Sequence, residues 1–249
     1  MTPMEQPALS TYANEIVYQR QIAQWAFRAM QEAMAAHSVA IRRVHELVAG
    51  RPGPLPDAVT ASTRPVMLDA IKASVRGLMA LQSMLTSAGI VSWILWPNPK
   101  KYGSEPEDRR RRRVARGDVL RAMLDVPDDS PLHVIPKGAD DVRGGLLHVD
   151  EILDDYVARF PDQGVDSFAF GTLDPALGWD PAKVVRVLDD SRWVARIGDR
   201  QIELTHIDSE LSRVANRLRA DLKVTTLEIP RMGGGGIGAF SMMGASDPK

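Results

Sequence analysis

The chain has 249 residues, 44% of them hydrophobic, which is enough for one sizeable core or two small ones. Its formal net charge of −1 indicates no general attraction to nucleic acid or to a membrane surface. The absence of cysteine excludes disulfides, zinc–thiolate sites and cysteine nucleophiles. The first ten residues lack the pattern of a secretory signal, and the most apolar window, Ala88–Trp96, is too short to span a bilayer. These features predict a soluble cytoplasmic protein that has no contact with a membrane.

Two helical patterns dominate the first half of the chain. Residues 1–10 contain two prolines and predict a flexible lead-in. From Thr11 to Ala49 there is no proline or glycine, and apolar residues recur at helical spacing, which predicts one long helix or two stacked ones. Four prolines and two glycines between Gly50 and Pro65 predict a linker before the next helix.

A second long helix is predicted from Val66 to Trp96. Pro97 ends it, because proline disfavours the helical conformation of the residue before it. Spacings of three and four predict a single buried face made of Leu68, Ile71, Val75, Leu78, Leu81 and Leu85. Trp93 and Trp96 are expected to pack where this helix meets its neighbour.

Two shorter helices are expected next. Apolar spacing predicts them over Val114–Val126 and, approximately, over Asp141–Phe160. Gly144 and Gly145 weaken the start of the later helix, because each costs a helix interior about 0.5–1 kcal/mol relative to alanine. We expect the bundle to be organised around the segment Asp141–Tyr156.

The last third of the chain changes from helical to strand-like patterns. Residues 161–181 predict a long loop, and three short runs follow over Val184–Leu188, Arg192–Ile197 and Arg200–Leu204. Gly198–Asp199 separates the second run from the third and is a hairpin signal, so we expect a small antiparallel β-meander at about residues 184–204. A final helix is predicted from the spacing of Ile207, Leu211, Val214, Leu218 and Leu222.

Together these patterns predict a mainly α fold. We expect a helical bundle of about four long helices in a single domain over residues 11–222, with the β-meander before the C-terminal helix. A flexible glycine-rich tail is expected over residues 223–249, and its short apolar end could dock on a partner protein.

Arginines are concentrated between the second and third predicted helices. Eight basic residues and three acidic ones lie between Lys100 and Arg116. Clustered guanidiniums bind phosphate oxygens in pairs and displace counterions, so this stretch fits a phosphate or nucleic-acid surface. A solvated helix start and a site for an acidic partner fit the same residues. The candidate RNA-binding residues are Arg109, Arg110, Arg111, Arg112, Arg113 and Arg116.

Arg143 and His148 are the candidate catalytic pair. An arginine can hold a phosphate, and a histidine can act as general base or acid near neutral pH. In a regular helix, five residues of separation rotate one side chain about 140° from the other, so the pair converges only if the two glycines between them loosen the first turn. An ordinary helix histidine bonded to a neighbouring acid is the alternative for His148. The sequence has no recognisable motif for a metal ion or a cofactor, and none is expected.

Three segments, Trp93–Pro97, Arg116–Leu132 and Arg143–Leu153, resemble in this order a group of uncharacterised bacterial helical proteins. The spacing of Arg143 and His148 is similar to the Arg-x4–6-His signature of the HEPN superfamily. The resemblance covers about residues 70–220. It implies a helical bundle that forms homodimers and acts on RNA, in a stress or defence setting.

In the active ribonucleases of that superfamily, the arginines and histidines of two subunits face each other, and the RNA 2′-hydroxyl attacks the adjacent phosphate without a metal ion. By that match Arg143 would hold the scissile phosphate and His148 would transfer the proton. The chain has Gly144 where the family usually has Asn, Asp or His. Gly145 and Leu147 replace two further positions that are polar in the uncharacterised bacterial group. These replacements fit a degenerate member that binds RNA or dimerises without cleaving it.

Two functions therefore stay open. The first is that of a HEPN-like RNA-binding protein or metal-independent ribonuclease. The second is that of a catalytically inactive, dimerising interaction protein that binds a partner through its charged faces or its C-terminal tail.

Overall fold

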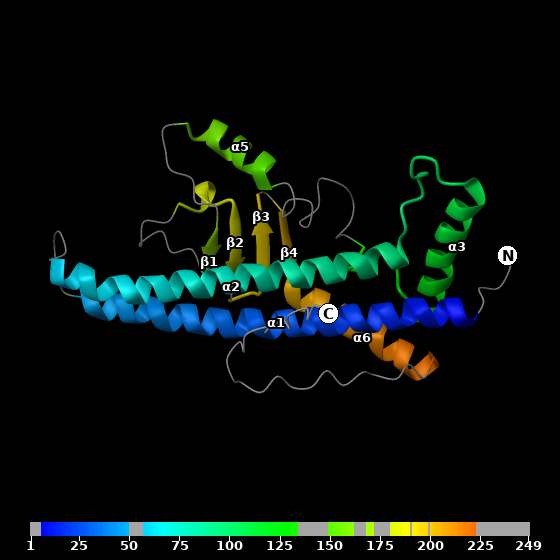
Figure 1. Cartoon of the computed structure of the whole chain (residues 1–249), viewed down its shortest axis with the longest axis horizontal. Coiled ribbons are helices and arrows are strands. Elements are labelled where there is room, and N and C mark those ends of the chain that lie inside the picture. Colours follow the sequence, from blue (N-terminus) through cyan, green and yellow to red (C-terminus); the bar gives the residue numbers. More distant parts are fainter. Residues whose placement is uncertain are drawn as a thin grey trace, which may run out of the picture.

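Two long antiparallel helices, α1 (Gln6–Val48) and α2 (Asp57–Leu95), run side by side along the long axis of the molecule (Figure 1). The computed structural model describes residues 6–49, 57–133, 149–161, 168–171, 180–189, 191–198 and 200–222. α3 (Glu107–Leu124) stands at the end where α1 begins and α2 ends. α6 (Leu204–Leu222) packs against α1, and the short α5 (Val149–Arg159) lies beyond a small sheet. The mainly helical fold confirms the class predicted from the sequence.

The sheet has four strands in the order β1 (Ala169–Phe170), β2 (Arg186–Asp189), β3 (Val194–Ile197) and β4 (Arg200–Glu203). The last three form the expected antiparallel meander. Gly198 turns the chain between β3 and β4 with a φ of +58°, which glycine adopts without strain. β1 pairs in parallel with β2 and comes from the stretch expected to be a loop, because two residues are too few to produce a detectable alternation.

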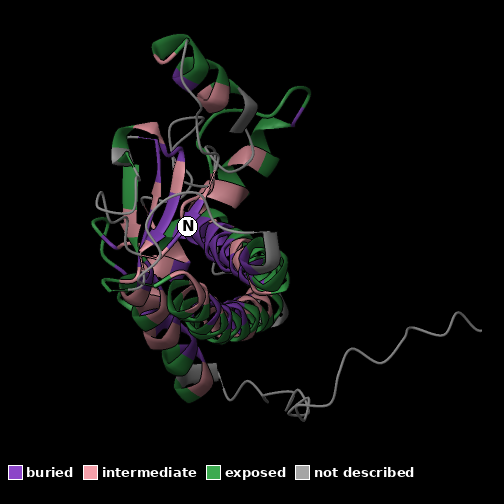
Figure 2. Cartoon of the chain, turned by 90° about the vertical axis from the view of Figure 1, so that its left-hand side faces the viewer, coloured by how far each residue is buried: buried purple, intermediate pink, exposed green. Residues whose placement is uncertain are grey.

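The core lies between the α1–α2 hairpin, the sheet and α6. In Figure 2, buried residues line the side of the hairpin that is turned towards the sheet, and exposed residues line the opposite side. α6 adds four fully buried side chains that confirm its predicted apolar face: Ile207, Leu211, Val214 and Leu218. The largest fully buried side chains are Ile16, Met30, Leu81, Met84, Leu85, Leu95, Leu120, Leu124, Leu132, Leu188 and Leu204.

Residues 149–156, the described part of the segment Asp141–Tyr156, are not the centre of this core. They belong to α5, where Tyr156 is buried and Ile152 packs at the margin of the main core. The acidic residues next to them in the sequence are exposed: Glu151, Asp154 and Asp155. A helix of 11 residues buries much less apolar surface than two helices of 43 and 39 residues, so the hairpin organises the fold.

Three helices begin earlier than the sequence predicts. α1 begins at Gln6, within the expected lead-in, and α3 begins at Glu107, so the whole arginine run is helical. Acids in the first turn of α3 favour a helix start there, and arginine is a good helix former. α2 begins at Asp57 and contains Pro65, which removes one backbone hydrogen bond. Burial of Val59 and Thr63 helps to offset that loss.

The apolar face predicted for α2 is wrong in its first half. Leu81 and Leu85 are each 1% exposed, but Leu68, Ile71 and Val75 are 48%, 54% and 52% exposed. The buried side of this half is made of small residues instead: Ala70, Ala73, Gly77 and Ala80. A Cβ on Gly77 would lie 2.1 Å from the ring of Phe170, so β1 packs where the helix has no side chain.

Among the described residues, α2 is also the helix whose length and composition would allow it to cross a membrane. Its most apolar 18-residue window is 61% buried inside the protein. Most of that window therefore has protein neighbours in this fold.

Candidate nucleic-acid interface

The candidate catalytic pair, Arg143 and His148, lies outside the described residues. α5 begins at Val149, directly after His148. Convergence of the two side chains therefore stays a prediction.

The arginine run is held in place by a loop that folds back on α3. α3 follows Pro106, which caps it without a side-chain hydrogen bond. Arg113 forms a buried ion pair with Glu105, in which Nη2 lies 2.8 Å from Oε2 and the side chains are 14% and 7% exposed. Arg113 also donates to the backbone carbonyls of Asn98 and Lys100. One side chain thus ties both ends of the loop to the helix.

This ion pair lowers the pKa of Glu105. The hydrogen bond from Arg113 is the main cause, because it stabilises the carboxylate. Glu107 is exposed and accepts from both Arg110 and Arg111, which lowers its pKa to about 2. Both acids therefore stay ionised well below neutral pH and neutralise part of the arginine run.

Three of the six candidate RNA-binding residues bind other parts of the protein and hold them against α3. Arg113 holds the loop, as described, and Arg110 donates to the backbone carbonyl of Pro99 at 2.9 Å. Arg116 donates to the hydroxyl of Tyr12 at 3.2 Å and lies 4.5 Å from the centre of its ring, which joins α3 to α1.

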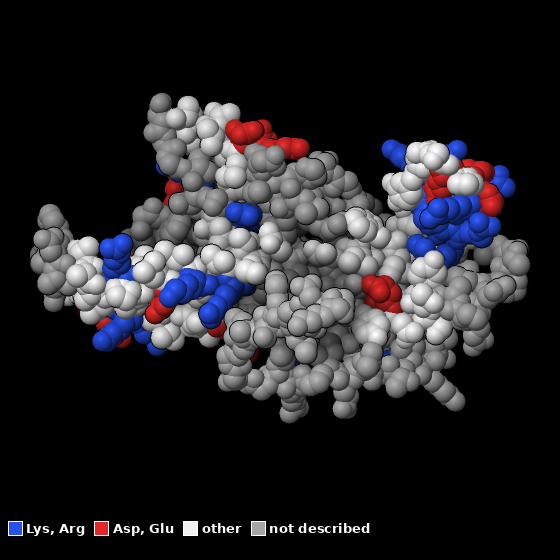
Figure 3. Space-filling view, viewed as in Figure 1, with Lys and Arg blue, Asp and Glu red and all other residues white. Residues whose placement is uncertain are grey.

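The other three, Arg109, Arg111 and Arg112, are exposed to solvent. The side chains of Arg111 and Arg112 are 75% and 74% exposed, and each pairs at 3.2 Å with an acid four residues earlier, Glu107 or Asp108. Exposed ion pairs of this kind contribute little to stability, so an incoming phosphate can replace the acid. Figure 3 shows basic side chains gathered over α3 with acidic ones among them.

A groove of about 680 Å³ lies beside this surface, between the end of α2, the following loop and α3. Trp96 forms one wall: its ring stacks on His133, with ring centres 4.5 Å apart and planes 10° apart. Trp93 is 45% exposed and Tyr102 55% exposed, although Arg113 covers one face of the tyrosine ring. The lining residues are Trp93, Trp96, Pro97, Asn98, Pro99, Lys100, Tyr102, Val114, Asp118, Arg121 and His133.

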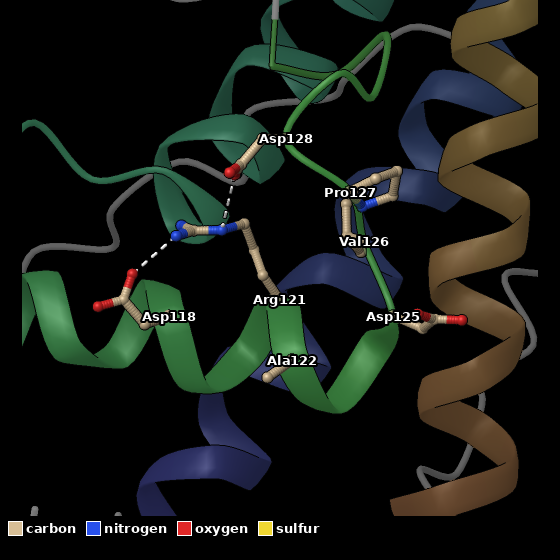
Figure 4. A pocket seen from close by; sticks show the side chains of 7 residues that line it. All are labelled: Asp118, Arg121, Ala122, Asp125, Val126, Pro127 and Asp128. Atoms are coloured by element: carbon tan, nitrogen blue, oxygen red, sulfur yellow. Dashed lines mark hydrogen bonds and ion pairs between the residues drawn. The ribbon is translucent and has the colours of Figure 1, made fainter.

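A smaller cavity of about 350 Å³ adjoins the groove and shares Asp118 and Arg121 with it (Figure 4). Arg121 lies between two acids, with Nη2 2.7 Å from Asp118 and Nε 3.6 Å from Asp128. Asp125 adds a third carboxylate to the lining. This acidic lining is unsuited to a phosphate. Within the described ranges, no group of three or more His, Asp or Glu side chains could hold a metal ion.

The sequence pointed to the arginines but not to the groove. Trp96 packs at a helix contact as expected, whereas Trp93 remains half exposed and lines the groove. His133 joins the wall from 37 residues beyond Trp96, which no spacing rule could indicate. The signal that could have found the groove is the run of aromatic, proline and lysine residues from Trp93 to Tyr102.

No protein-family model matches the chain, and neither the curated proteins nor the solved structures contain a significant match. The resemblance to the HEPN superfamily therefore stays a prediction.

Proposed function

We propose that the chain is a HEPN-like RNA-binding protein that contacts the phosphate backbone through the exposed arginines of α3. The observation that carries this proposal is that the arginine run contains two kinds of side chain: some bind other parts of the protein, and the others face solvent. The buried pair of Arg113 and Glu105 fixes the start of the helix, and from it Arg109, Arg111 and Arg112 project into solvent. Cations on a fixed helix lose less conformational freedom on binding than cations on a mobile segment.

The expected binding is electrostatic and depends on salt. For single strands, the slope of log K against log salt concentration is about −0.7 per phosphate neutralised, so three arginines give a slope of about −2. The overall net charge of −1 adds no further attraction, so the effect is confined to this surface.

The test is fluorescence anisotropy with a labelled single-stranded RNA over a range of salt concentrations. R109E/R111E/R112E should abolish binding, because reversal leaves like charges facing the phosphates. The matched control is R42E/R43E/R64E, which reverses three arginines that are also exposed but lie on α1 and α2. Equal losses in the two variants, or no binding by the unaltered protein at low salt, would contradict the proposal.

Ribonuclease activity is the catalytic form of the same proposal. Arg143 would hold the scissile phosphate while His148 accepts the proton of the 2′-hydroxyl. The oxygen of that hydroxyl would bond to phosphorus, the bond from phosphorus to the 5′-oxygen would break, and the released 5′-oxygen would take a proton from water. Cleavage should then persist in a metal chelator and leave a 2′,3′-cyclic phosphate. Loss of cleavage in Arg143→Ala and in His148→Ala is the expected result, and unchanged cleavage in the double variant would remove the pair from the site.

The second candidate function is that of an interaction protein that forms homodimers, and the exposed stripe on α2 favours it. Leu68, Ile71, Val75 and Met79 recur at spacings of three and four, so they share one side of the helix, and they are 48–62% exposed. Large apolar side chains that face solvent while small ones face inward are typical of a surface that packs against another helix. A two-fold dimer buries the same patch on both copies, which suits a stripe of this kind.

Sedimentation velocity over a range of concentrations tests this assembly. I71E/V75E should shift a dimer to a monomer, because each copy would place charges in the contact. The control is Gln31→Glu, which adds a charge at an exposed position of α1 and not on the stripe. A monomer at every concentration in the unaltered protein would rule out the dimer.

A further inference from the structure

We infer that the groove between α2 and α3 takes an unpaired base of single-stranded RNA, with the attached phosphate held by Arg111 and Lys100. This inference rests on the proposed RNA-binding function and adds the contact to the base. It also assigns different roles to arginines that the sequence treats alike.

The size and lining of the groove fit a planar aromatic ligand. Its volume of about 680 Å³ lies within the range of about 300–1,000 Å³ that is usual for small-ligand sites. Two half-exposed rings, those of Trp93 and Tyr102, line it together with the stacked pair of Trp96 and His133. Aromatic side chains bind bases of any sequence by stacking, because every base has a flat π-surface.

The walls are held in position before a ligand binds. Trp96 donates its Nε1 hydrogen to Asp128 at 3.3 Å, and Arg121 lies 5.7 Å from the centre of the tryptophan ring. Tyr102 is fixed by Arg113, whose guanidinium lies 4.2 Å from its ring centre. Ring positions that are set in advance reduce the entropy lost on binding.

Helix geometry places Arg111 on the groove side of α3. Val114 and Asp118 line the groove, and Arg111 precedes them by three and seven residues, which is the spacing of neighbours on one helix side. Arg112 is rotated a further 100° around the helix. Lys100 lines the groove from the loop and is exposed, so Arg111 and Lys100 bring positive charge to the same rim.

Arg111 and Arg112 therefore form a matched pair for a test. Their side chains are equally exposed, and each pairs with an acid at 3.2 Å. If an RNA base occupies the groove, Arg111→Ala should weaken binding more than Arg112→Ala does. If the arginines attract RNA only through their charge, the two variants should weaken it equally.

The probes are a fluorescein-labelled decamer of adenylate, the same decamer paired with oligouridylate, the corresponding DNA decamer, and inorganic tripolyphosphate. Trp93→Ala and Tyr102→Ala should each weaken binding of the single-stranded RNA about 10- to 100-fold, the range expected for loss of one stacked base. Trp93→Phe keeps an aromatic ring and should restore most of the binding. Tripolyphosphate has no base, so it should bind the unaltered protein and the two alanine variants equally. The paired decamer should bind the unaltered protein more weakly, because its bases are not available for stacking.

Besides equal effects of Arg111→Ala and Arg112→Ala, three outcomes would overturn the inference. If both aromatic variants bind the RNA decamer as the unaltered protein does, while R109E/R111E/R112E fails to bind, base stacking is wrong and the proposed RNA binding stands. Tighter binding of the DNA decamer than of the RNA would make DNA the ligand. If the unaltered protein binds none of the nucleic acids at low salt, the proposed function fails together with this inference. Circular dichroism of every variant separates loss of binding from loss of fold.

Discussion

The two halves of α2 have the same apolar spacing but opposite surroundings. In the second half, Leu81 and Leu85 are buried among α1, the sheet and the rest of the core. In the first half, Leu68 and Val75 face solvent, and small residues such as Gly77 make the internal contact. Apolar periodicity therefore locates a helical face, but it does not say whether the protein's own core covers that face.

This difference separates two kinds of surface on one helix. The end of α2 near α3 carries the ring of Trp93 and lies beside the arginines of α3, which suit an RNA strand. The end near Asp57 carries exposed aliphatic side chains, which suit another helix. Substitutions in the two halves should therefore have different effects on stability and on binding.

The largest difference in stability is expected between two leucine-to-alanine variants, one in each half of α2. Leu85→Ala should lower the free energy of unfolding by about 2–5 kcal/mol, because it leaves a cavity in the core. Leu68→Ala should change it by no more than about 0.5 kcal/mol in dilute solution, since the side chain is 48% exposed. Denaturation in urea measures both values. Equal losses in the two variants would mean that the first half of α2 is covered in solution.

A smaller effect is expected where β1 meets the first half of α2. Gly77→Ala should destabilise the protein by about 1–3 kcal/mol, because its Cβ would lie 2.1 Å from the ring of Phe170. Alanine's better helix propensity offsets about 1 kcal/mol of this. The control is Ser83→Ala, at an exposed position of α2. The double variant G77A/F170L should recover part of the loss, and no recovery would place the strain elsewhere.

The smallest change in stability is expected at low pH, where the ion pairs of the loop beside α3 are lost. The pKa values of Glu105 and Glu107 are lowered in the folded protein, to about 2 for Glu107. Their contribution to stability is therefore present above the ordinary glutamate pKa and is lost as the pH falls from about 4.5 towards 2. Denaturation at pH 7 and at pH 3 should show that Glu105→Gln costs less stability at the lower pH. An equal cost of Glu105→Gln at pH 7 and at pH 3 would contradict the ion pair. The control is Glu46→Gln, which lies near the C-terminal end of α1, away from α3.

The same ion pairs should also limit the affinity for RNA. Glu107→Gln removes a carboxylate that accepts from Arg110 and Arg111. RNA binding at low salt should become a few-fold tighter, because two guanidiniums are no longer partly neutralised. Glu46→Gln should leave the affinity unchanged. Weaker binding by Glu107→Gln would show that this carboxylate is needed to hold the arginines in place.

The sequence located the last helix and the meander well, because both have regular local patterns. Ile207, Leu211, Val214 and Leu218 are buried as their spacing predicts, and Gly198 makes the expected turn. The start of α2 was harder to predict, because Pro65 disfavours a helix and is offset by the burial of Val59 and Thr63. The earlier start of α3 has local signals instead: acids in its first turn and arginines, which favour a helix. The groove could not be predicted, since His133 reaches Trp96 through the fold rather than through sequence spacing.

By itself, the sequence determined that the chain is mainly helical, that its arginines are concentrated in one stretch, and that a small meander precedes the last helix. These properties follow from local propensity, charge and period. Only the tertiary structure decided which arginines are buried in contacts and which face solvent, and which apolar side of α2 enters the core. Both depend on neighbours that are distant in sequence: Tyr12 fixes Arg116, and Phe170 fills the space left by Gly77.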